Sequence, residues 1–370
     1  MEFFNDPALA TRPAGDEFEL MVFGPGCGEC LVMHCGGQQW CIIDSCRYPR
    51  QEFPIALQYL EKLDIDPKTA VRSILVTHWH DDHIRGMAAL VRRCSEARFN
   101  ISGALHHDQF FRLVLEVEDA NKLVRASSSA SEFGEILDIL EQRGNPPPFS
   151  VEDGTMIFQN IQEPTVLVQA ISPSPETVRQ TRVMLADRIL VDTQTRQFRK
   201  VGPNDLSVAV QVITPTRRLL LKADLEDSTD DLCGWKAVLS SSLNRPVDNS
   251  IVKVGHHGSG NADNHDVWSK IVSDSPLSIV TPYSRQRIPL PKDDDVRRIL
   301  SRGGQAYCTT WPPANRPQRR RQIDAIMNTA LRNRQSVSRQ SGAVRLRFSL
   351  QDDDLAPRIE LFGSACSLQS

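Results

Sequence analysis

The sequence predicts an α+β fold in which two β-sheets pack face to face and helices cover their outer faces. Apolar strand-like runs and amphipathic helix-like runs follow one another along most of the 370 residues, a mixture that suits such a layered sandwich. A cluster of metal-binding residue types stands where one strand-like run ends. The length permits one large domain or two.

The first part of the chain supplies the first sheet. Residues 18–44 show the apolar pattern of two or three strands, and Phe53–Leu63 shows that of an amphipathic helix. Arg72–Val76 is expected to be a strand that leads directly into the cluster. Ile84–Arg93 is expected to continue from the cluster as one helix behind it.

Residues 108–148 are expected to form a helical insertion over one edge of the cluster. Two helices are predicted there, Asp108–Val124 and Ser131–Gln142, and Pro146–Pro148 ends the second because proline cannot continue a helix. The insertion is either a lid or interaction surface, or an extension of the scaffold.

The second sheet is expected from residues 151–224, which alternate strands and turns. Helices and strands then alternate over Asp227–Leu243, Ile251–Val254, Asp263–Ser273, Leu277–Thr281, Asp293–Arg302 and Gln305–Thr309. The predicted domain spans residues 18–310. Residues 311–370 form an arginine-rich C-terminal extension, expected to pack on the same domain, with closing strands at 342–350 and 357–362.

Five residues of a six-residue window, His78 to His83, can bind metal. His78 and His80 leave the strand on the same side, because strand side chains alternate. Asp82 and His83 follow on a turn, where neighbouring side chains point in different directions and can hold a second ion. Imidazole and carboxylate at this density suit a divalent transition metal.

Thr77–Gly86 resembles the signature of the metallo-β-lactamase fold superfamily. Other segments resemble, in the same order, one branch of it, the soluble domain of competence-type DNA-uptake proteins (ComEC-like). The resemblance covers about residues 18 to 310, and the segments that carry it are Gly24–Leu31 with Ile42–Ser45, Asn204–Ser207, Leu219–Glu226 and Val252–Ser259.

The resemblance implies one or two bound divalent ions, Zn²⁺ or Mn²⁺ with Mg²⁺ as an alternative. It implies that His257 is favoured as a ligand over His256, which would face substrate, and that Asp44 accepts the other N–H of a ligand imidazole. The implied metal ligands are His78, His80, Asp82, His83, Asp224 and His257, and the implied catalytic residues are Asp82, Asp224 and His256.

The chain departs from the family at three places. Ala170–Pro175 holds no histidine where most members carry the one that completes a metal site, and Ala223 replaces a glycine. Thr281–Pro289 replaces a segment with Asn and His-Pro. Its arginines, Arg285 and Arg287, are candidate contacts to an anionic substrate, unless the loop simply differs.

These features predict a metal-dependent phosphodiesterase or nuclease that acts on DNA through a metal-activated hydroxide. One alternative is a hydrolase of small esters, lactones or cyclic nucleotides, since the fold hosts many chemistries. Another is an effector or scaffold subunit of a bacterial defence or DNA-handling complex. In that case residues 108–148 and the arginines of residues 316–347 would be docking surfaces for a protein partner. The same arginines could instead bind phosphate groups of a nucleic acid, or form an ordinary solvated surface.

Composition adds little about partners. The net charge of −3 gives no bulk signal for nucleic acid, and no run of eighteen apolar residues predicts a membrane span. The first residues lack a basic segment followed by an apolar one, so the cytoplasm is the expected location. Among nine cysteines, Cys27 and Cys30 form an isolated Cys-x-x-Cys pair; structural thiols are expected, with zinc binding or redox chemistry as alternatives.

Overall fold

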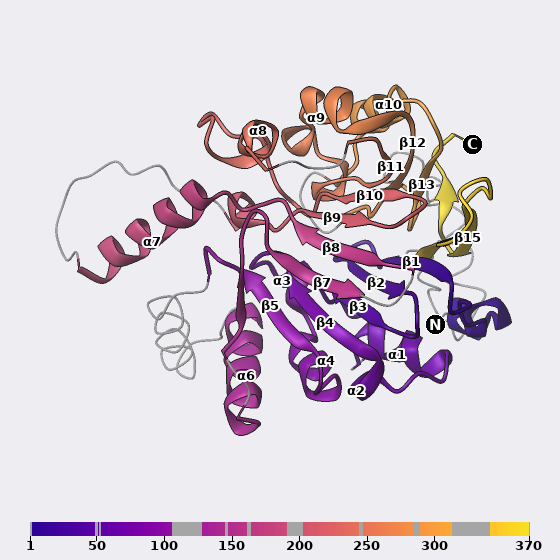
Figure 1. Cartoon of the computed structure of the whole chain (residues 1–370), viewed down its shortest axis with the longest axis horizontal. Helices are drawn as coiled ribbons and strands as arrows, with labels where there is room; N and C mark the ends of the chain where they lie inside the picture. The colour runs from indigo at the N-terminus through magenta and orange to yellow at the C-terminus, as the bar shows by residue number, and fades with distance from the viewer. Residues whose placement is uncertain are drawn as a thin grey trace, which may run out of the picture.

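Two mixed β-sheets pack face to face in the computed structural model, and helices lie on both outer faces (Figure 1). The α+β class and the two-sheet sandwich predicted from the sequence are confirmed. The structure describes residues 2–48, 51, 53–105, 128–144, 147–160, 164–190, 203–243, 247–284, 289–312 and 341–369.

The first sheet joins strands from both ends of the chain. The strands β3 to β6 run parallel, and the others pair antiparallel. In spatial order the described strands are β15 (Arg358–Gly363), β14 (Gly342–Ser349), β1 (Glu17–Gly24), β2 (Cys30–Cys35), β3 (Trp40–Ile43), β4 (Val71–Val76), β5 (Arg98–Ser102) and β6 (Phe149–Val151).

The second sheet has the same kind of plan. The strands β10 to β13 are parallel neighbours, and antiparallel strands flank them. In spatial order the described strands are β16 (Cys366–Ser367), β13 (Ala306–Cys308), β12 (Val272–Val280), β11 (Asn249–Lys253), β10 (Arg218–Leu221), β9 (Val210–Ile213), β8 (Val166–Ala170) and β7 (Met156–Asn160).

Helices complete a four-layer arrangement. Beside the first sheet lie α1 (Ile55–Lys62), α2 (Pro67–Ala70), α4 (Met87–Arg93) and α6 (Ser128–Gln142), and beside the second lie α8 (Gly234–Ser240), α9 (His265–Lys270) and α10 (Asp293–Leu300) (Figure 1). The helix α7 (Pro175–Leu190) projects sideways. Short turns of 3₁₀ helix span Glu2–Asn5, Pro7–Ala10, Pro203–Leu206, His256–Gly258 and Gly260–Ala262. None of the helices described here is long and apolar enough to cross a bilayer.

Strand alternation divides the apolar side chains among three cores. On β1, Phe18, Leu20 and Val22 face the second sheet, whereas Met21 and Phe23 face the helices. The core between the sheets therefore uses one face of each strand. The outer face of the first sheet packs on α1, α4 and α6, and that of the second sheet on α8, α9 and α10.

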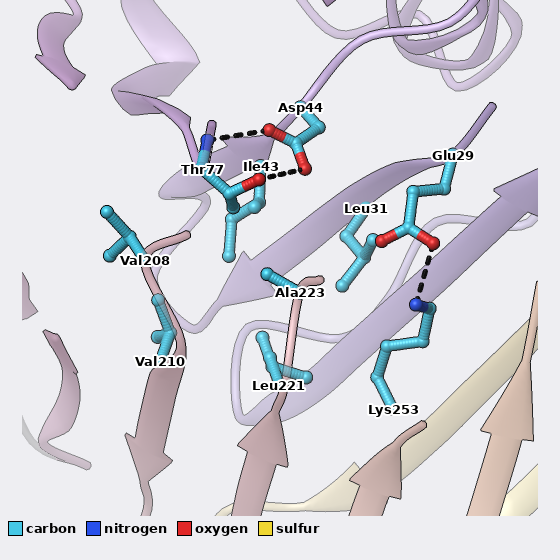
Figure 2. Close-up of a pocket in the computed structure, with 10 residues that line it drawn as sticks. All are labelled: Glu29, Leu31, Ile43, Asp44, Thr77, Val208, Val210, Leu221, Ala223 and Lys253. Atoms are coloured by element: carbon cyan, nitrogen blue, oxygen red, sulfur yellow. Dashed lines mark hydrogen bonds and ion pairs between the residues drawn. The ribbon is translucent and has the colours of Figure 1, made fainter. Parts of the chain in front are cut away.

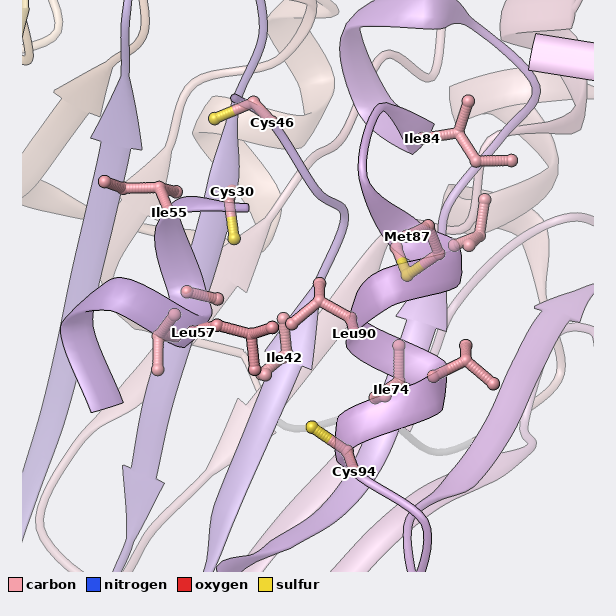
Figure 3. Close-up of a cluster of buried hydrophobic side chains, with 14 of the residues drawn as sticks. Cys30, Ile42, Cys46, Ile55, Leu57, Ile74, Ile84, Met87, Leu90 and Cys94 are labelled. Carbon is pink, nitrogen blue, oxygen red and sulfur yellow. The ribbon is translucent and has the colours of Figure 1, made fainter. Parts of the chain in front are cut away.

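The cysteines of the first sheet pack as small core side chains. Cys30, Cys46 and Cys94 are buried among isoleucines and leucines beneath α1 and α4 (Figure 3). Burial holds the pKa of the Cys30 and Cys46 thiols well above the usual value, which keeps them protonated and unreactive. The prediction of structural thiols is confirmed for these residues, and also for the buried Cys35 and Cys41.

Two helix predictions need correction. The stretch 151–224, expected to hold only strands and turns, contains α7. The expected helix Ile84–Arg93 is two pieces, α3 (Asp81–Ile84) and α4, because Gly86 between them has φ +88°. A Cβ at Gly86 would also come within 2.7 Å of Arg47 Nε, so glycine suits this position both sterically and conformationally.

The described part of the predicted insertion is scaffold. The helix α6 buries Phe133 and Ile136 in the core beneath the first sheet. The Phe133 ring packs edge-on against Trp79, with centroids 4.9 Å apart, and Glu132 accepts a 2.9 Å hydrogen bond from Ala88 N–H at the start of α4. This helix therefore supports the turn that holds the predicted metal ligands His78 to His83. The predicted helix Asp108–Val124 lies outside the described residues.

The C-terminal strands are integral to the sandwich. The predicted strands at 342–350 and 357–362 are confirmed as β14 and β15, and β14 pairs with β1 along its whole length. Both strands therefore belong to the first sheet. Arg345 and Arg347, which the sequence grouped with possible phosphate-binding arginines, are buried on β14; the arginines of residues 316–339 lie outside the described residues.

His34 gives the fold a measurable pH dependence. It accepts a hydrogen bond from Gln38 N–H at Nε2, and burial lowers its pKa to about 4. Because the unfolded chain takes up a proton near pH 6.5 and the folded chain does not, the free energy of unfolding should fall as pH drops from 6.5 to 4, by about 3 kcal/mol. Urea titrations of wild type and His34→Gln should show a shallower decline in the variant; equal declines would contradict this.

Candidate metal centre

The residues of the candidate centre follow the ends of four strands. Asp44 comes directly after β3 and Thr77 directly after β4, which are parallel neighbours in the first sheet. Asp224 follows β10 and His257 follows β11, which are parallel neighbours in the second sheet. Carboxyl ends of parallel strands meet at one edge of a sheet, and Val208 N–H joins the two edges by donating to Thr77 O (3.0 Å).

The first ligand group consists of His78, His80 and Asp224, whose candidate ligand atoms all lie within 4.8 Å of one another. His78 Nε2 is 3.1 Å from His80 Nδ1 and 3.8 Å from Asp224 Oδ2. His78 and Asp224 are buried, and His80 is partly exposed. Three protein ligands and an approach from solvent are typical of a catalytic metal position, which leaves one coordination site open.

The second ligand group consists of Asp82, His83 and His257. His257 Nε2 lies 3.2 Å and His83 Nε2 3.7 Å from Asp82 Oδ2. Asp224 Oδ2 is also close, 3.5 Å from His83 Nε2 and 3.9 Å from His257 Nε2. Asp224 thus stands between the two groups, where it can serve both.

Asp44 orients two of the imidazoles. Its Oδ2 accepts hydrogen bonds of 2.7 Å from His83 Nδ1–H and from Thr77 Oγ1–H. Because the Thr77 proton goes to Asp44, Thr77 Oγ1 is left to accept from His78 Nδ1–H at 3.0 Å. Both rings therefore present the lone pair of Nε2 to the centre, the arrangement that a ligand histidine needs.

His257 has the same tautomer for a different reason. Its Nδ1–H donates to the main-chain oxygen of Thr281 at 2.8 Å, and a carbonyl can only accept. The lone pair of Nε2 then faces the Asp82 carboxylate. Two electron-rich atoms at 3.2 Å repel each other unless positive charge lies between them, either on the ring or as a bound cation.

The electrostatics of the centre favour positive charge. Burial alone would lower the pKa of His83, but three carboxylates, of which Asp224 acts most strongly, outweigh it and hold that pKa well above the ordinary value. The pKa of His257 is raised against burial in the same way. Burial would raise the pKa of Asp224, yet His83 and His257 hold it well below the usual range.

The residues present fit divalent metal. In this structure His83 Nε2 and Asp224 Oδ1 are buried without a hydrogen-bond partner, which is costly unless an ion satisfies them. Two ligands at about 2.0–2.1 Å from one tetrahedral zinc ion are about 3.3 Å apart. The donor pairs here span 3.1–3.9 Å, so small shifts would suffice to bind an ion in each group.

Backbone strain concentrates at the centre. Among the described residues other than glycine, seven have positive φ, and four of them belong to the site: Asp44, Ala223, His256 and His257. Such conformations cost of order 1–3 kcal/mol each and persist where the surroundings enforce them, commonly at functional sites. At Ala223, with φ +46°, a glycine would adopt the same backbone conformation without this cost.

His256 lies at the rim rather than inside a ligand group. Its Nδ1 is 2.9 Å from Glu226 Oε1, and its Nε2 is 3.9 Å from Asp224 Oδ2. Asn204 Nδ2 donates to the same Glu226 oxygen at 2.7 Å and so holds the carboxylate in place. The side chain of His256 is 14% exposed, whereas that of His257 is 1% exposed, so His256 is the histidine that can meet a substrate.

Other predicted positions have mixed outcomes. Ser172 lies in Ala170–Pro175, the segment that lacks the usual histidine. Its hydroxyl donates a hydrogen bond to the main-chain oxygen of Ser207 and accepts one from Ala209 N–H. Arg285 and Arg287 lie outside the described residues. Thr77, Asn204 and Glu226 lie within the segments that carry the resemblance, but no role was predicted for them from the sequence.

Replacing Asp44 tests the orienting network. Both oxygens of Asp44 accept hydrogen bonds: Oδ1 from Thr77 N–H at 2.8 Å, and Oδ2 from His83 and from the Thr77 hydroxyl. In Asp44→Asn, an amide NH₂ replaces one of these oxygens and must face a donor, so the network that orients the rings is disrupted. Metal affinity should fall by about 10–100-fold, measured by titrating Zn²⁺ against a competing chelator. Asp81→Asn, which changes the half-exposed neighbouring carboxylate, should leave the affinity unchanged; equal losses in both variants would contradict the role of Asp44.

Comparisons with known proteins assign no family to this chain. No family model and no curated protein matches the chain. Among solved structures it is similar to the metallo-β-lactamase fold protein YhfI from Bacillus subtilis (9% identity, 80% of this chain and 98% of that chain, TM-score 0.37). It is also similar to the short form of human tRNase Z (13% identity, 63% of this chain and 76% of that chain, TM-score 0.31). A third similar structure is Zn²⁺-bound PqqB from Methylobacterium extorquens (8% identity, 75% of this chain and 82% of that chain, TM-score 0.35).

Proposed function

We propose that this protein is a metal-dependent hydrolase that cleaves phosphodiester bonds, with DNA as the first candidate substrate. The observation that carries the proposal is the pairing of two ligand groups around one shared carboxylate, Asp224. Divalent cations bound there would supply Lewis acidity and a water activated near neutral pH. No serine or cysteine nucleophile is needed for such a reaction.

The roles of the chain's own residues follow from their positions. His78, His80 and Asp224 would hold one ion, and Asp82, His83 and His257, with Asp224 shared, would hold the other. Asp44 and Thr77 keep the ligand imidazoles in the correct tautomer. His256, held by Glu226 at the rim, presents Nε2 towards the space beside Asp224, where it can stabilise charge on a reacting oxygen.

Two neighbouring cation positions favour a phosphodiester over a carboxylic ester. A phosphodiester carries a negative charge before reaction and gains more in the transition state, and a pair of cations can stabilise both the attacking and the leaving oxygen. The arginines at 285, 287 and 316–339 would add attraction for a polyanion, as the sequence suggests. A small ester, lactone or cyclic-nucleotide hydrolase is the second candidate, because the centre itself would serve those reactions too.

A substrate panel decides between these candidates. The purified chain, supplied with Mn²⁺, Zn²⁺ or Mg²⁺, should cleave single- or double-stranded DNA, RNA or bis(p-nitrophenyl) phosphate, and His80→Ala should not. Turnover of p-nitrophenyl acetate or a lactone without phosphodiester cleavage would move the assignment to the second candidate. Equal trace activity in wild type and His80→Ala would refute a hydrolase at this centre.

A further inference from the structure

A buried ion pair lies between the two sheets directly beneath the metal centre. Glu29, at the start of β2, places Oε2 2.7 Å from Nζ of Lys253, the last residue of β11, and both are 1% exposed. Figure 2 shows the pair at one side of a small cavity whose other walls include Leu31, Val210 and Leu221, with Asp44 and Thr77 at the opposite side.

Stability alone gives little reason for such a pair. Removing two charges from water costs several kcal/mol each, and apolar residues of similar volume are often as stabilising or more so. The neighbouring wall is already apolar, so leucine or methionine would suit both positions. The contacts of Glu29 and Lys253 with neighbouring residues therefore give a better explanation for the presence of this ion pair.

Glu29 is connected to two residues of the second ligand group. Thr281 Oγ1 donates to Glu29 Oε2, and the main-chain oxygen of Thr281 accepts from His257 Nδ1–H at 2.8 Å. Glu29 Oε2 itself lies 3.9 Å from His257 Nδ1. At the other end of the residue, Glu29 N–H donates to the main-chain oxygen of Asp82 at 3.1 Å.

The Glu29 carboxylate also approaches the ligand atoms themselves. One of its oxygens lies within 4.8 Å of the candidate ligand atoms of His83 and Asp224. All these contacts concern the second ligand group and the shared Asp224. Lys253 Nζ pairs with Glu29 Oε2 at 2.7 Å and also donates a hydrogen bond to Val254 O at 3.0 Å, so the position of the carboxylate is restrained.

We infer that Glu29 is a positioning residue for the ion of the second ligand group. Its negative charge favours the cation, Thr281 transmits its position to His257, and Lys253 fixes its orientation. This inference rests on the proposed metal-dependent function and deepens it. It implies that only the ion of the second ligand group needs the Glu29 carboxylate for tight binding. The ion held by His78, His80 and Asp224 is near Glu29 only through the shared Asp224, so it should depend on Glu29 much less.

The experiment separates charge from packing. Glu29→Gln removes the charge but leaves Lys253 unpaired, so the double variant Glu29→Gln/Lys253→Met, which removes both charges, is the decisive one. Glu19→Gln is the matched control, since Glu19 is equally buried and ion-paired, with Arg347, but belongs to the opposite face of the first sheet. Zn²⁺ binding is measured by chelator competition and by metal content per chain, and folding by urea titration.

Wild type and Glu19→Gln should each bind two Zn²⁺ ions per chain. In Glu29→Gln and in the double variant, the affinity for one of the two ions should fall by about 10–100-fold, the usual effect of losing a residue that supports a ligand. In a His80→Ala background, where the second ligand group remains, adding Glu29→Gln should weaken the remaining ion by the same factor.

A folded double variant that binds both ions as tightly as wild type would overturn the inference and leave the pair a structural one. So would a loss of the same ion in Glu19→Gln, because it would trace the effect to general destabilisation. Wild type that binds no Zn²⁺ would refute the proposed function itself, which distinguishes that failure from this one.

Discussion

Asp224→Ala should abolish hydrolysis and reduce the metal content of the protein from two ions to one or none. Asp224 Oδ2 lies within 3.9 Å of ligand nitrogens from both groups, so its loss weakens both ion positions at once. A metal acting as a Lewis acid supplies several kcal/mol of transition-state stabilisation, so kcat/KM should fall by at least about 10³-fold. Phosphodiester cleavage and metal content, measured on the same samples, test this.

Asp231→Ala is the matched control for that experiment. Asp231 is an exposed carboxylate on the same segment, where it pairs with Lys236 at 2.8 Å, and its removal should change neither activity nor metal content. Urea titrations should show that Asp224→Ala remains folded. If a folded Asp224→Ala protein kept both ions, Asp224 would not be the shared ligand, and the two groups could not act as one centre.

Arg347→Leu should destabilise the fold by about 3–5 kcal/mol, the usual result of leaving one partner of a buried ion pair without the other. Arg347 Nε lies 2.5 Å from Glu19 Oε2, and Tyr59 O–H donates to the other oxygen of Glu19 at 2.7 Å. Both charged residues are fully buried on the face of the first sheet that packs against α1. Urea titration at pH 7 gives the free energy of unfolding.

Two further variants show whether burial is the cause. Arg358→Ala removes an arginine of β15 whose side chain is 57% exposed, and it should cost no more than about 1 kcal/mol. Glu19→Met/Arg347→Leu removes both charges and should recover much of the stability lost in Arg347→Leu. If Arg347→Leu lowered the free energy of unfolding by less than about 1 kcal/mol and weakened DNA binding instead, Arg347 would be a phosphate-binding surface residue. That is the role suggested by its position in an arginine-rich segment.

The centre was readable from the sequence only where its residues are close together in the chain. His78, His80, Asp82 and His83 follow one strand, so strand alternation and a turn suffice to predict that they converge. Asp224 and His257 reach them from the second sheet, and only the resemblance to a known family indicated that. No local pattern reports a contact such as that between His257 and Asp82, which are 175 residues apart.

The sequence around Glu29 and Lys253 shows a pattern that could have indicated their pairing. Each is a charged residue in or beside an apolar strand-like run. Glu29 directly precedes Cys30-Leu31-Val32, and Lys253 lies within Ile251-Val252-Lys253-Val254. Buried charges of opposite sign tend to be paired. Two such positions near predicted ligands could have suggested an ion pair, although not which ligand it supports.

The errors in the fold also have physical causes. The helix α7 is mostly polar and projects from the sandwich, so it lacks the apolar stripe of helical period that reveals a packed helix. The closing strands β14 and β15 were visible as local patterns. Their place at one end of the first sheet, with β14 beside β1, was not, because pairing with β1 depends on a register that neither strand shows alone.

The position of β14 has a consequence for biosynthesis. The partners Glu19 and Arg347 are 328 residues apart, so at ordinary translation rates of about 5–20 residues per second β1 waits roughly 16–66 s on the ribosome for its neighbour. During that time its backbone edge is open to association with other nascent chains. A premature stop codon or proteolytic cut ahead of β14 would leave this edge of β1 permanently unpaired, so loss of β14 should destabilise the whole sandwich rather than only its margin.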